Sequence, residues 1–328
     1  MNSAMFLSLL AVAFTGALML LMPHFSSPRY LFAVTVPAGF RASEPGRAAL
    51  RRYHWWVVRA IAGSAVVVVG VAQSWPDLAV VLAMLLPAIA GMATFLRERS
   101  LLRGYAAPPP GVREADLAPE SGHLPRWIAL ALVPLALPLA AAAYLRAHWS
   151  EIPARFPVHW GAAGEPNRWA DKTPAAVYGP LEFGAGMMLV LLLLGLAIFY
   201  GSRRTPQRIA VLKILVASVY FLGLIFTGVG LVPAVKIPLA AFIAVTLLFA
   251  AAVIAWGYKI VTDPAQPVEA TLDQYWYLGS IYCNPQDPAI FVQKRIGFGY
   301  TINFGNRMSW LLLAGFVAGM AGLIRVAR

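Results

Sequence analysis

Long apolar stretches alternate with short polar segments along the whole chain. Eight stretches are long enough to cross a bilayer as helices, with approximate limits at 4–22, 55–73, 78–96, 127–145, 179–200, 211–233, 238–258 and 309–325. Hydrocarbon offers no hydrogen-bond partners, so each stretch must satisfy its own backbone groups and predicts a spanning helix. Connections of only a few residues, at 74–77 and 235–237, predict two helical hairpins.

Composition supports this pattern. Hydrophobic residues make up 60% of the 328 positions and charged residues 12%, which excludes a large water-soluble core. The net charge is +12, but Lys and Arg flank the apolar stretches rather than forming a stripe, which argues against nucleic-acid binding. Cys283 is the single cysteine, so no intrachain disulfide can form. The predicted fold class is an all-α polytopic membrane protein with about eight transmembrane helices.

The positions of the cations predict the orientation. Eighteen of the 26 Lys and Arg residues fall in one set of loops and seven in the other. Because cytoplasmic loops carry the excess of cations, we expect both termini to lie outside. Arg59 lies about one turn inside the second span, and we expect its head to reach back to the cytoplasmic surface. The predicted organisation is spans one to seven in 1–258, including an outer loop at 146–178, a cytoplasmic cap at 259–308 and the last span in 309–328.

The outer loop is the longest outer connection, and it is dense in Pro, Gly, Trp and charge. Pro153, Pro157 and Pro166 argue against a long helix. The residues at 158–160 favour a strand, and the glycines at 161–164 favour a turn. We therefore expect a structured lid on the outer surface. Candidate binding residues in and beside it are His159, Trp160, Glu165, Trp169, Asp171, Lys172 and Glu182.

Other chemistry remains open for this loop. His and carboxylate side chains can hold zinc, but no His-Glu-x-x-His motif is present. The weak metal candidates are His148, Glu151 and His159, the first two facing one way if the fourth helix continues that far. In an enzyme, His159 would act as general base beside Glu165 and Glu182. In the simplest alternative, His159 and Trp160 only pack the loop, and its charged residues form surface ion pairs. No cofactor is predicted.

The segment between the last two spans carries a second dense pattern. Asn-Pro at 284–285 and Asp-Pro at 287–288 indicate turns, and 290–292 and 300–304 are rich in strand formers. These features predict a small β-rich cap. Its candidate site residues are Asn284, Asp287, Lys294, Arg295 and Asn303.

Two expectations concern the surroundings of this cap. We expect Lys294 and Arg295 to face anionic lipid headgroups or to dock a cytoplasmic regulator. Residues 30–37 alternate apolar positions on the same side of the membrane, and we expect them to pair with the cap as a strand.

Both patterns resemble known membrane modules. Pro-Val-His-Trp at 157–160, Gly-Glu-Pro at 164–166 and Trp-Ala-Asp-Lys at 169–172 resemble a loop module that also occurs in SdpI-like proteins, which are bacterial immunity proteins against a secreted toxin. The Asn-Pro-x-Asp-Pro pattern at 284–288, with Lys-Arg at 294–295 and Tyr-Thr-Ile-Asn-Phe at 300–304, resembles an element found in relatives of that loop family. The resemblance implies a multi-pass protein of the bacterial plasma (inner) membrane, in a branch distinct from the immunity protein proper.

The predicted function is therefore binding, as immunity or envelope sensing through the outer loop. The expected partners are the lipid bilayer, a peptide toxin or envelope ligand outside, and a regulator on the cytoplasmic side. The alternatives are a membrane-embedded enzyme, metal-dependent or not, that uses His159 with nearby carboxylates, and a transporter of a small or lipid-like substrate.

Overall fold

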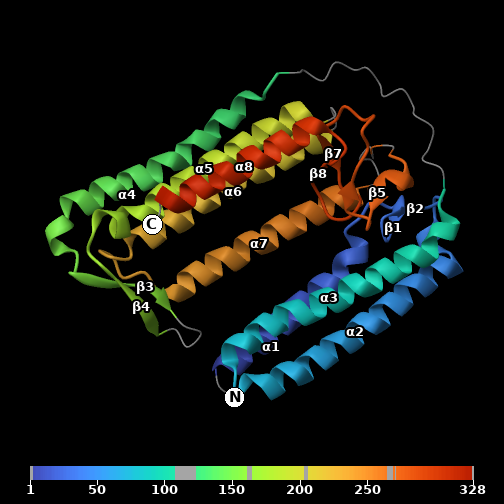
Figure 1. The fold of residues 1–328 in the computed structure, drawn as a ribbon, viewed down its shortest axis with the longest axis horizontal. Coiled ribbons are helices and arrows are strands. Elements are labelled where there is room, and N and C mark those ends of the chain that lie inside the picture. The colour runs from blue at the N-terminus through green and yellow to red at the C-terminus, as the bar shows by residue number, and fades with distance from the viewer. Residues whose placement is uncertain are drawn as a thin grey trace. The chain divides into compact units, whose positions relative to one another are not determined.

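Eight long helices dominate the computed structural model, which describes residues 3–107, 123–160, 165–202, 206–263, 269 and 271–326 (Figure 1). All eight predicted spans coincide with helices that are long and apolar enough to cross a membrane. The mostly helical fold class and the multi-pass architecture are therefore confirmed. The helices are α1 (Ser3–Leu21), α2 (Glu44–Ala72), α3 (Pro76–Leu102), α4 (Ala136–Ala147), α5 (Pro174–Gly201), α6 (Pro206–Leu231), α7 (Leu239–Thr262) and α8 (Arg307–Val326).

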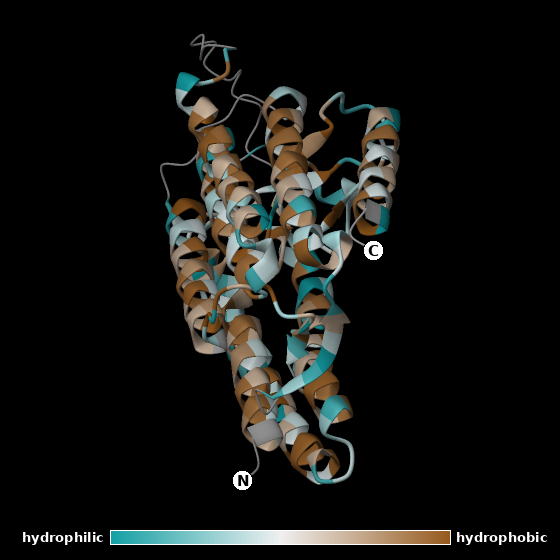
Figure 2. Ribbon diagram, turned by 90° about the vertical axis from the view of Figure 1, so that its left-hand side faces the viewer, coloured by the Kyte–Doolittle hydropathy of each residue, from teal (hydrophilic) through white to brown (hydrophobic). Residues whose placement is uncertain are grey.

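Several helices extend beyond the apolar stretches that predict them. Hydrophobic colouring fills the middle of the long helices, and hydrophilic residues gather at helix ends and in the connections (Figure 2). The helix α2 begins at Glu44 rather than near 55, because the Ser43 hydroxyl caps it by accepting a hydrogen bond from the Gly46 amide at 3.4 Å. Hydropathy identifies only the length of such a helix that lies inside the bilayer. The fourth span begins as a 3₁₀ helix, η4 (Arg126–Leu135), and continues as α4.

The connections, where the structure describes them, hold four two-stranded sheets. Their strands are β1 (Tyr30–Leu31) with β2 (Val34–Thr35), β3 (Arg155–Trp160) with β4 (Pro166–Asp171), β5 (Trp276–Tyr277) with β6 (Ile281–Tyr282), and β7 (Phe291–Gln293) with β8 (Tyr300–Ile302). The expected strands of the loop and of the cap are thus present. The expected strand pairing of residues 30–37 with the cap is wrong, because β1 pairs with β2 through a tight turn in which Phe32 and Ala33 have positive φ.

The chain forms two compact units. The first contains residues 1–116, 257–283 and 293–301. Within it, α1, α2 and α3 pack together around a buried cluster that includes the whole β1–β2 turn, with Tyr53 and Phe95 against Phe32. Arg41 fixes the loop that precedes this turn, since its guanidinium donates to the carbonyls of Pro23 at 3.2 Å and Tyr30 at 2.6 Å.

The second unit contains residues 117–256, 284–292 and 302–328. The helices α5 and α6 form its centre and approach closely at two glycines: Gly184 lies against Phe226, and Gly230 lies against Leu181. A second buried cluster joins α4, the β3–β4 hairpin and the start of α5. This cluster fixes the position of the hairpin that carries most of the predicted binding residues.

Candidate functional site

The pairing of the two strands in the β3–β4 hairpin is irregular around His159. The strands are antiparallel, with Phe156 opposite Ala170 and His159 opposite Arg168, and the register shifts on both sides of His159. A bulge breaks the alternation of a strand and turns neighbouring side chains toward one face. The predicted turn at 161–164 lies outside the described residues.

Both ends of the hairpin are fixed to helices. Ile152 and Phe156 are buried in the cluster with Leu145 of α4 and Val177 of α5. On the other strand, the Lys172 ammonium donates to the Ile152 carbonyl at 3.0 Å and lies 5.2 Å from the centre of a Trp149 ring. Lys172 therefore holds the base of the hairpin closed instead of forming a surface ion pair.

A cavity of about 640 Å³ lies between β3 and the ends of three helices. Five consecutive residues of β3, 156–160, line one side. The other walls are mainly apolar and come from the start of α5, the end of α6, the connection after it and the start of α7: Ala176, Pro180, Ile225, Val229, Gly230, Val232, Pro233, Ile237, Pro238, Phe242 and Thr246. Polar side chains at this cavity are few, which is typical of sites for apolar or amphipathic molecules.

His159 is the titratable group of this lining. Its Nδ1 lies 2.6 Å from Oδ1 of Asn167 on the opposing strand. An amide oxygen only accepts hydrogen bonds, so Nδ1 is the donor to Asn167 and Nε2 is left to hydrogen-bond a ligand. Trp160 adjoins it and offers an indole N–H.

The remaining predicted binding residues lie elsewhere. Glu165, Trp169, Asp171 and Glu182 are exposed and do not belong to the cavity lining. Asp171 forms an exposed pair with Arg155 at 3.9 Å, a geometry that contributes little to stability. The structure thus brings His159 and Trp160 to one cavity, whereas the two glutamates proposed to assist His159 do not line it.

The weak metal candidates are not brought together either. The His148 ring stacks on Tyr144 at 4.2 Å, and its Nδ1 lies 2.9 Å from the Tyr144 carbonyl. Glu151 is exposed in the short 3₁₀ helix η5 (Trp149–Glu151), because the fourth helix ends at Ala147 and does not carry both residues. In the described part of the chain, no three His, Cys, Asp or Glu side chains form a group that could hold a metal ion.

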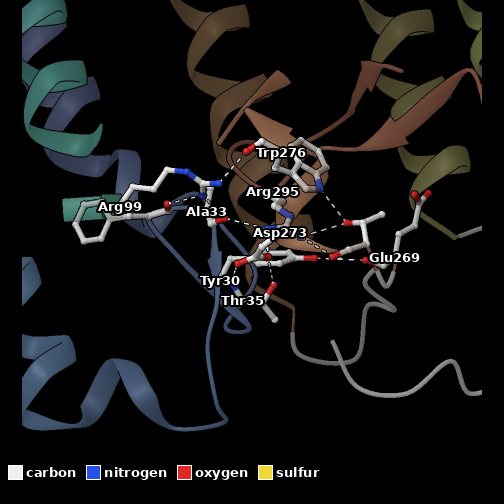
Figure 3. A network of polar contacts seen from close by, with 10 residues as sticks. Tyr30, Ala33, Thr35, Arg99, Glu269, Asp273, Trp276 and Arg295 are labelled. Carbon is white, nitrogen blue, oxygen red and sulfur yellow. Dashed lines mark hydrogen bonds and ion pairs between the residues drawn. The ribbon is translucent and has the colours of Figure 1, made fainter. Parts of the chain in front are cut away.

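Arg295, predicted to face headgroups, lies inside the first unit instead (Figure 3). Its side chain is 1% exposed, forms an ion pair with Asp273 and donates to the Thr271 carbonyl at 2.5 Å. The guanidinium also lies 5.0 Å from the ring centres of both Tyr30 and Trp276. The headgroup expectation is wrong for Arg295, whereas its neighbour Lys294 is exposed.

The same network holds the β1–β2 turn. Arg99 donates to the carbonyls of Ala33 at 2.5 Å and Trp276 at 3.1 Å, and Arg295 reaches the same Ala33 carbonyl at 3.1 Å. Asp273 accepts from the Thr35 hydroxyl at 2.6 Å and from its amide at 3.2 Å. The expected association of residues 30–37 with the cap therefore exists, through side chains rather than strand pairing.

Burial also affects the phenol of Tyr30 in this network. Loss of contact with water raises the pKa of Tyr30, so the phenol stays neutral. Its hydroxyl donates to the Glu269 carbonyl at 3.4 Å. The sequence gives no sign that Asp273 pairs with Arg295, or that Arg99 shares the Ala33 carbonyl with it, because the three lie in separate segments of the chain.

In the second unit, Asn303 organises the two other residues of the predicted cap site that lie there, Asn284 and Asp287. Its side chain is fully buried and its amide donates to the carbonyls of Asn284 at 3.0 Å, Asp287 at 3.1 Å and Ala289 at 3.1 Å. Its Oδ1 accepts from the amides of Asn284 at 2.9 Å and Gly305 at 3.0 Å. We call residues 284–292 and 302–306 the Asn303 cluster.

The Asn303 cluster packs on the end of α5. The Ile290 amide donates to the Gly201 carbonyl at 3.0 Å, and Ser202 forms a parallel bridge with Phe291. Four of the five predicted cap residues therefore divide between the Asn303 cluster and the network of Arg295, and the fifth, Lys294, is exposed. In both, the described contacts satisfy backbone carbonyls, which is a structural role.

Comparison with known families agrees with the two modules. The family model described as "Domain of unknown function (DUF1648)" matches residues 129–181, which cover α4, the hairpin and the start of α5. A second, described as "Family of unknown function (DUF5808)", matches residues 285–310. Neither match covers half of the chain. No curated protein and no solved structure matches it.

The arginine network leads to a stability prediction. Replacing Arg295 by Gln leaves Asp273 without its cation in a largely buried site, and we expect a loss of about 3 kcal/mol of unfolding free energy. Lys294→Gln removes the same charge at the exposed neighbouring position and serves as the control. Urea unfolding in detergent, followed by Trp fluorescence, measures both. Equal midpoints for the two variants would show that the network contributes nothing.

The Asn303 cluster leads to a second stability prediction. A Cβ at Gly305 would lie 2.4 Å from the carbonyl carbon of Asn284, and a backbone atom cannot rotate away. We expect Gly305→Ala to cost about 1–3 kcal/mol. In α8, Gly315 has open space around its Cα, so Gly315→Ala is the matched control and should not lower the thermal midpoint. A midpoint unchanged in Gly305→Ala would contradict the packing described.

Proposed function

We propose that this membrane protein is a binding protein of the SdpI-like type, acting in immunity or envelope sensing. In this proposal the cavity beneath β3 receives the apolar part of an amphipathic ligand. The observation that carries it is that His159 and Trp160 adjoin an apolar cavity of about 640 Å³. The match of residues 129–181 to a domain associated with SdpI-like membrane proteins supports the type.

The chemistry of the lining suits such a ligand. Burial of an apolar chain contributes about 25 cal/mol per Å², so the helix walls supply most of the affinity. Nε2 of His159 and the indole N–H of Trp160 can hydrogen-bond the polar end of the ligand. His159 and Trp160 would thus bind the polar end of the ligand, and the walls formed by α6 and α7 would bind its apolar part.

Binding is favoured over catalysis by the positions of the carboxylates. A general base needs a partner or substrate within hydrogen-bond reach. The partner found for His159 is Asn167, which cannot exchange a proton at neutral pH, and Glu165 and Glu182 do not line the cavity. The transporter alternative gains no comparable observation from the described residues.

In this proposal the length of α5 places the hairpin and the Asn303 cluster on opposite sides of the membrane. The hairpin adjoins its start at Pro174, and the Asn303 cluster adjoins its end at Gly201, 28 residues later. At 1.5 Å per residue the two ends lie about 42 Å apart, enough to place them on opposite faces. The excess of cations assigns the hairpin and both termini to the outside, where a secreted peptide or envelope ligand arrives, and the Asn303 cluster to the cytoplasmic side, where a regulator could dock.

Occupancy of the cavity is tested with a fatty acid that carries a photoreactive diazirine in its chain. In lipid nanodiscs, we expect labelling at residues 156–160 and near Phe242. Thr246→Trp should reduce this labelling about tenfold, equivalent to about 1.4 kcal/mol, because the indole occupies the cavity. Leu248→Trp, on the same helix at a position 71% exposed and away from the cavity, is the control.

The role of the hairpin side chains is tested with the same probe. We expect Trp160→Ala and His159→Ala each to weaken labelling several-fold, whereas Trp169→Ala, at an exposed Trp of the opposing strand, should leave it unchanged. Labelling spread evenly over α8, or insensitive to Thr246→Trp, would rule out the cavity as the binding site.

Sidedness is tested by thiol labelling, since the chain has one cysteine. In intact cells, a membrane-impermeant maleimide should leave Cys283 unmodified. It should modify a cysteine that replaces Glu165 in a Cys283→Ser background. Protection of the cysteine at 165 until the cells are permeabilised would reverse the assignment of sides.

A further inference from the structure

Two arginines and two tryptophans form a cluster on the surface shared by α2 and α3. The Arg59 guanidinium lies 3.5 Å from the centre of the Trp55 ring and 5.8 Å from that of Trp56. From α3, the Arg97 guanidinium lies 5.8 Å from the same Trp56 ring. The two indoles pack edge to face, with centres 4.8 Å apart. We call these four residues the α2–α3 arginine site.

The carboxylates near this site are already engaged. Glu98 follows Arg97 in sequence, but its fully buried carboxylate is held by Arg52 through contacts of 3.2 and 2.7 Å. Farther along α2, Glu44 pairs with Arg47 and Arg51. Among the described residues, neither Arg59 nor Arg97 forms an ion pair, so no described carboxylate neutralises the two positive charges of the site.

The depth of the α2–α3 arginine site in the bilayer indicates what could neutralise its two positive charges. The 29 residues of α2 extend about 43 Å, whereas the hydrocarbon core is about 30 Å thick, so roughly 13 Å of the Glu44 end projects beyond it. Arg59 starts inside the core, and its head lies over Trp55, one turn back toward that projecting end. Tryptophan and snorkelling arginine are typical of the headgroup level.

We propose that Arg59 and Arg97 bind the phosphodiester headgroup of an anionic phospholipid, with Trp55 and Trp56 holding the two guanidiniums in place. A guanidinium can bind two phosphate oxygens at once, and contact with an aromatic face limits its motion. Both heads lie within 5.8 Å of one ring centre, so a single headgroup can reach both. Trp55 and Trp56 are 50% and 41% exposed, which leaves the site open to lipid. This site does not depend on the cavity beneath β3.

The test is native mass spectrometry of the full chain with added phosphatidylglycerol or phosphatidylethanolamine. The wild type should retain phosphatidylglycerol preferentially. In Arg59→Gln/Arg97→Gln we expect the affinity for it to fall about tenfold. In the control, Arg47→Gln/Arg51→Gln, it should stay within twofold, because that pair removes the same charge from arginines already paired with Glu44.

Folding and the source of the phosphate are checked separately. Thermal unfolding shows whether the double variant is folded, and Arg59→Lys/Arg97→Lys, which keeps both charges, should recover part of the retention. Equal retention in both Gln variants would overturn the proposal. Displacement of phosphatidylglycerol by millimolar inorganic phosphate would identify a site for free phosphate and would also overturn it.

Discussion

Backbone carbonyls outside the helices are satisfied by long polar side chains, and this interaction shapes both units of the protein. A helix satisfies its own backbone in the bilayer, but the segments between helices cannot do so. In the first unit Arg41, Arg99 and Arg295 donate to the carbonyls of the loop and turn before α2. In the second, Asn303 serves three carbonyls, and Lys172 serves one at the base of the hairpin. The primary role of the conspicuous polar residues between the spans is therefore to stabilise the fold of those segments.

The distinction between polar side chains that bond the backbone and those that do not reduces the number of candidate ligand-binding residues. Polar atoms that bond the backbone are less available to a ligand. Lys172 of the predicted binding set, and Arg295 and Asn303 of the predicted cap site, use their polar atoms in this way. His159 and Trp160 remain at an apolar cavity, and Arg59 and Arg97 remain without carboxylate partners. The two proposed sites each contain polar groups that the described backbone does not use.

Hydropathy alone predicted all eight helices, because spanning a bilayer requires long apolar stretches. Strand formers predicted β3, β7 and β8 but not β4, β5 or β6. The partners of the buried arginines were not predictable from one sequence. Arg99 meets Trp276 across 177 positions and Arg295 meets Ala33 across 262, and no local pattern encodes such contacts. The separation of Arg295 from Asn303 also depends on tertiary structure, since the two are eight residues apart. His159 was found from the density of unusual residues, but its neighbours in the cavity come from three helices distant in sequence.

The helix α5 connects the two matched modules, and in the proposed function this decides whether the protein could sense a ligand or only bind it. Ala176 and Pro180 at its start line the cavity, and Gly201 and Ser202 at its end hold residues 290 and 291 through backbone contacts. Gly201 also packs against the Phe291 ring, so the end of α5 has little freedom to move alone. A ligand that tilted α5 would therefore shift the Asn303 cluster with it. A ligand that entered the cavity by moving β3 alone would leave the cluster in place, because β3 joins α4 and β4 rather than the end of α5. In the proposed function, sensing thus requires displacement of α5, whereas binding requires only that the hairpin admits the ligand to the cavity.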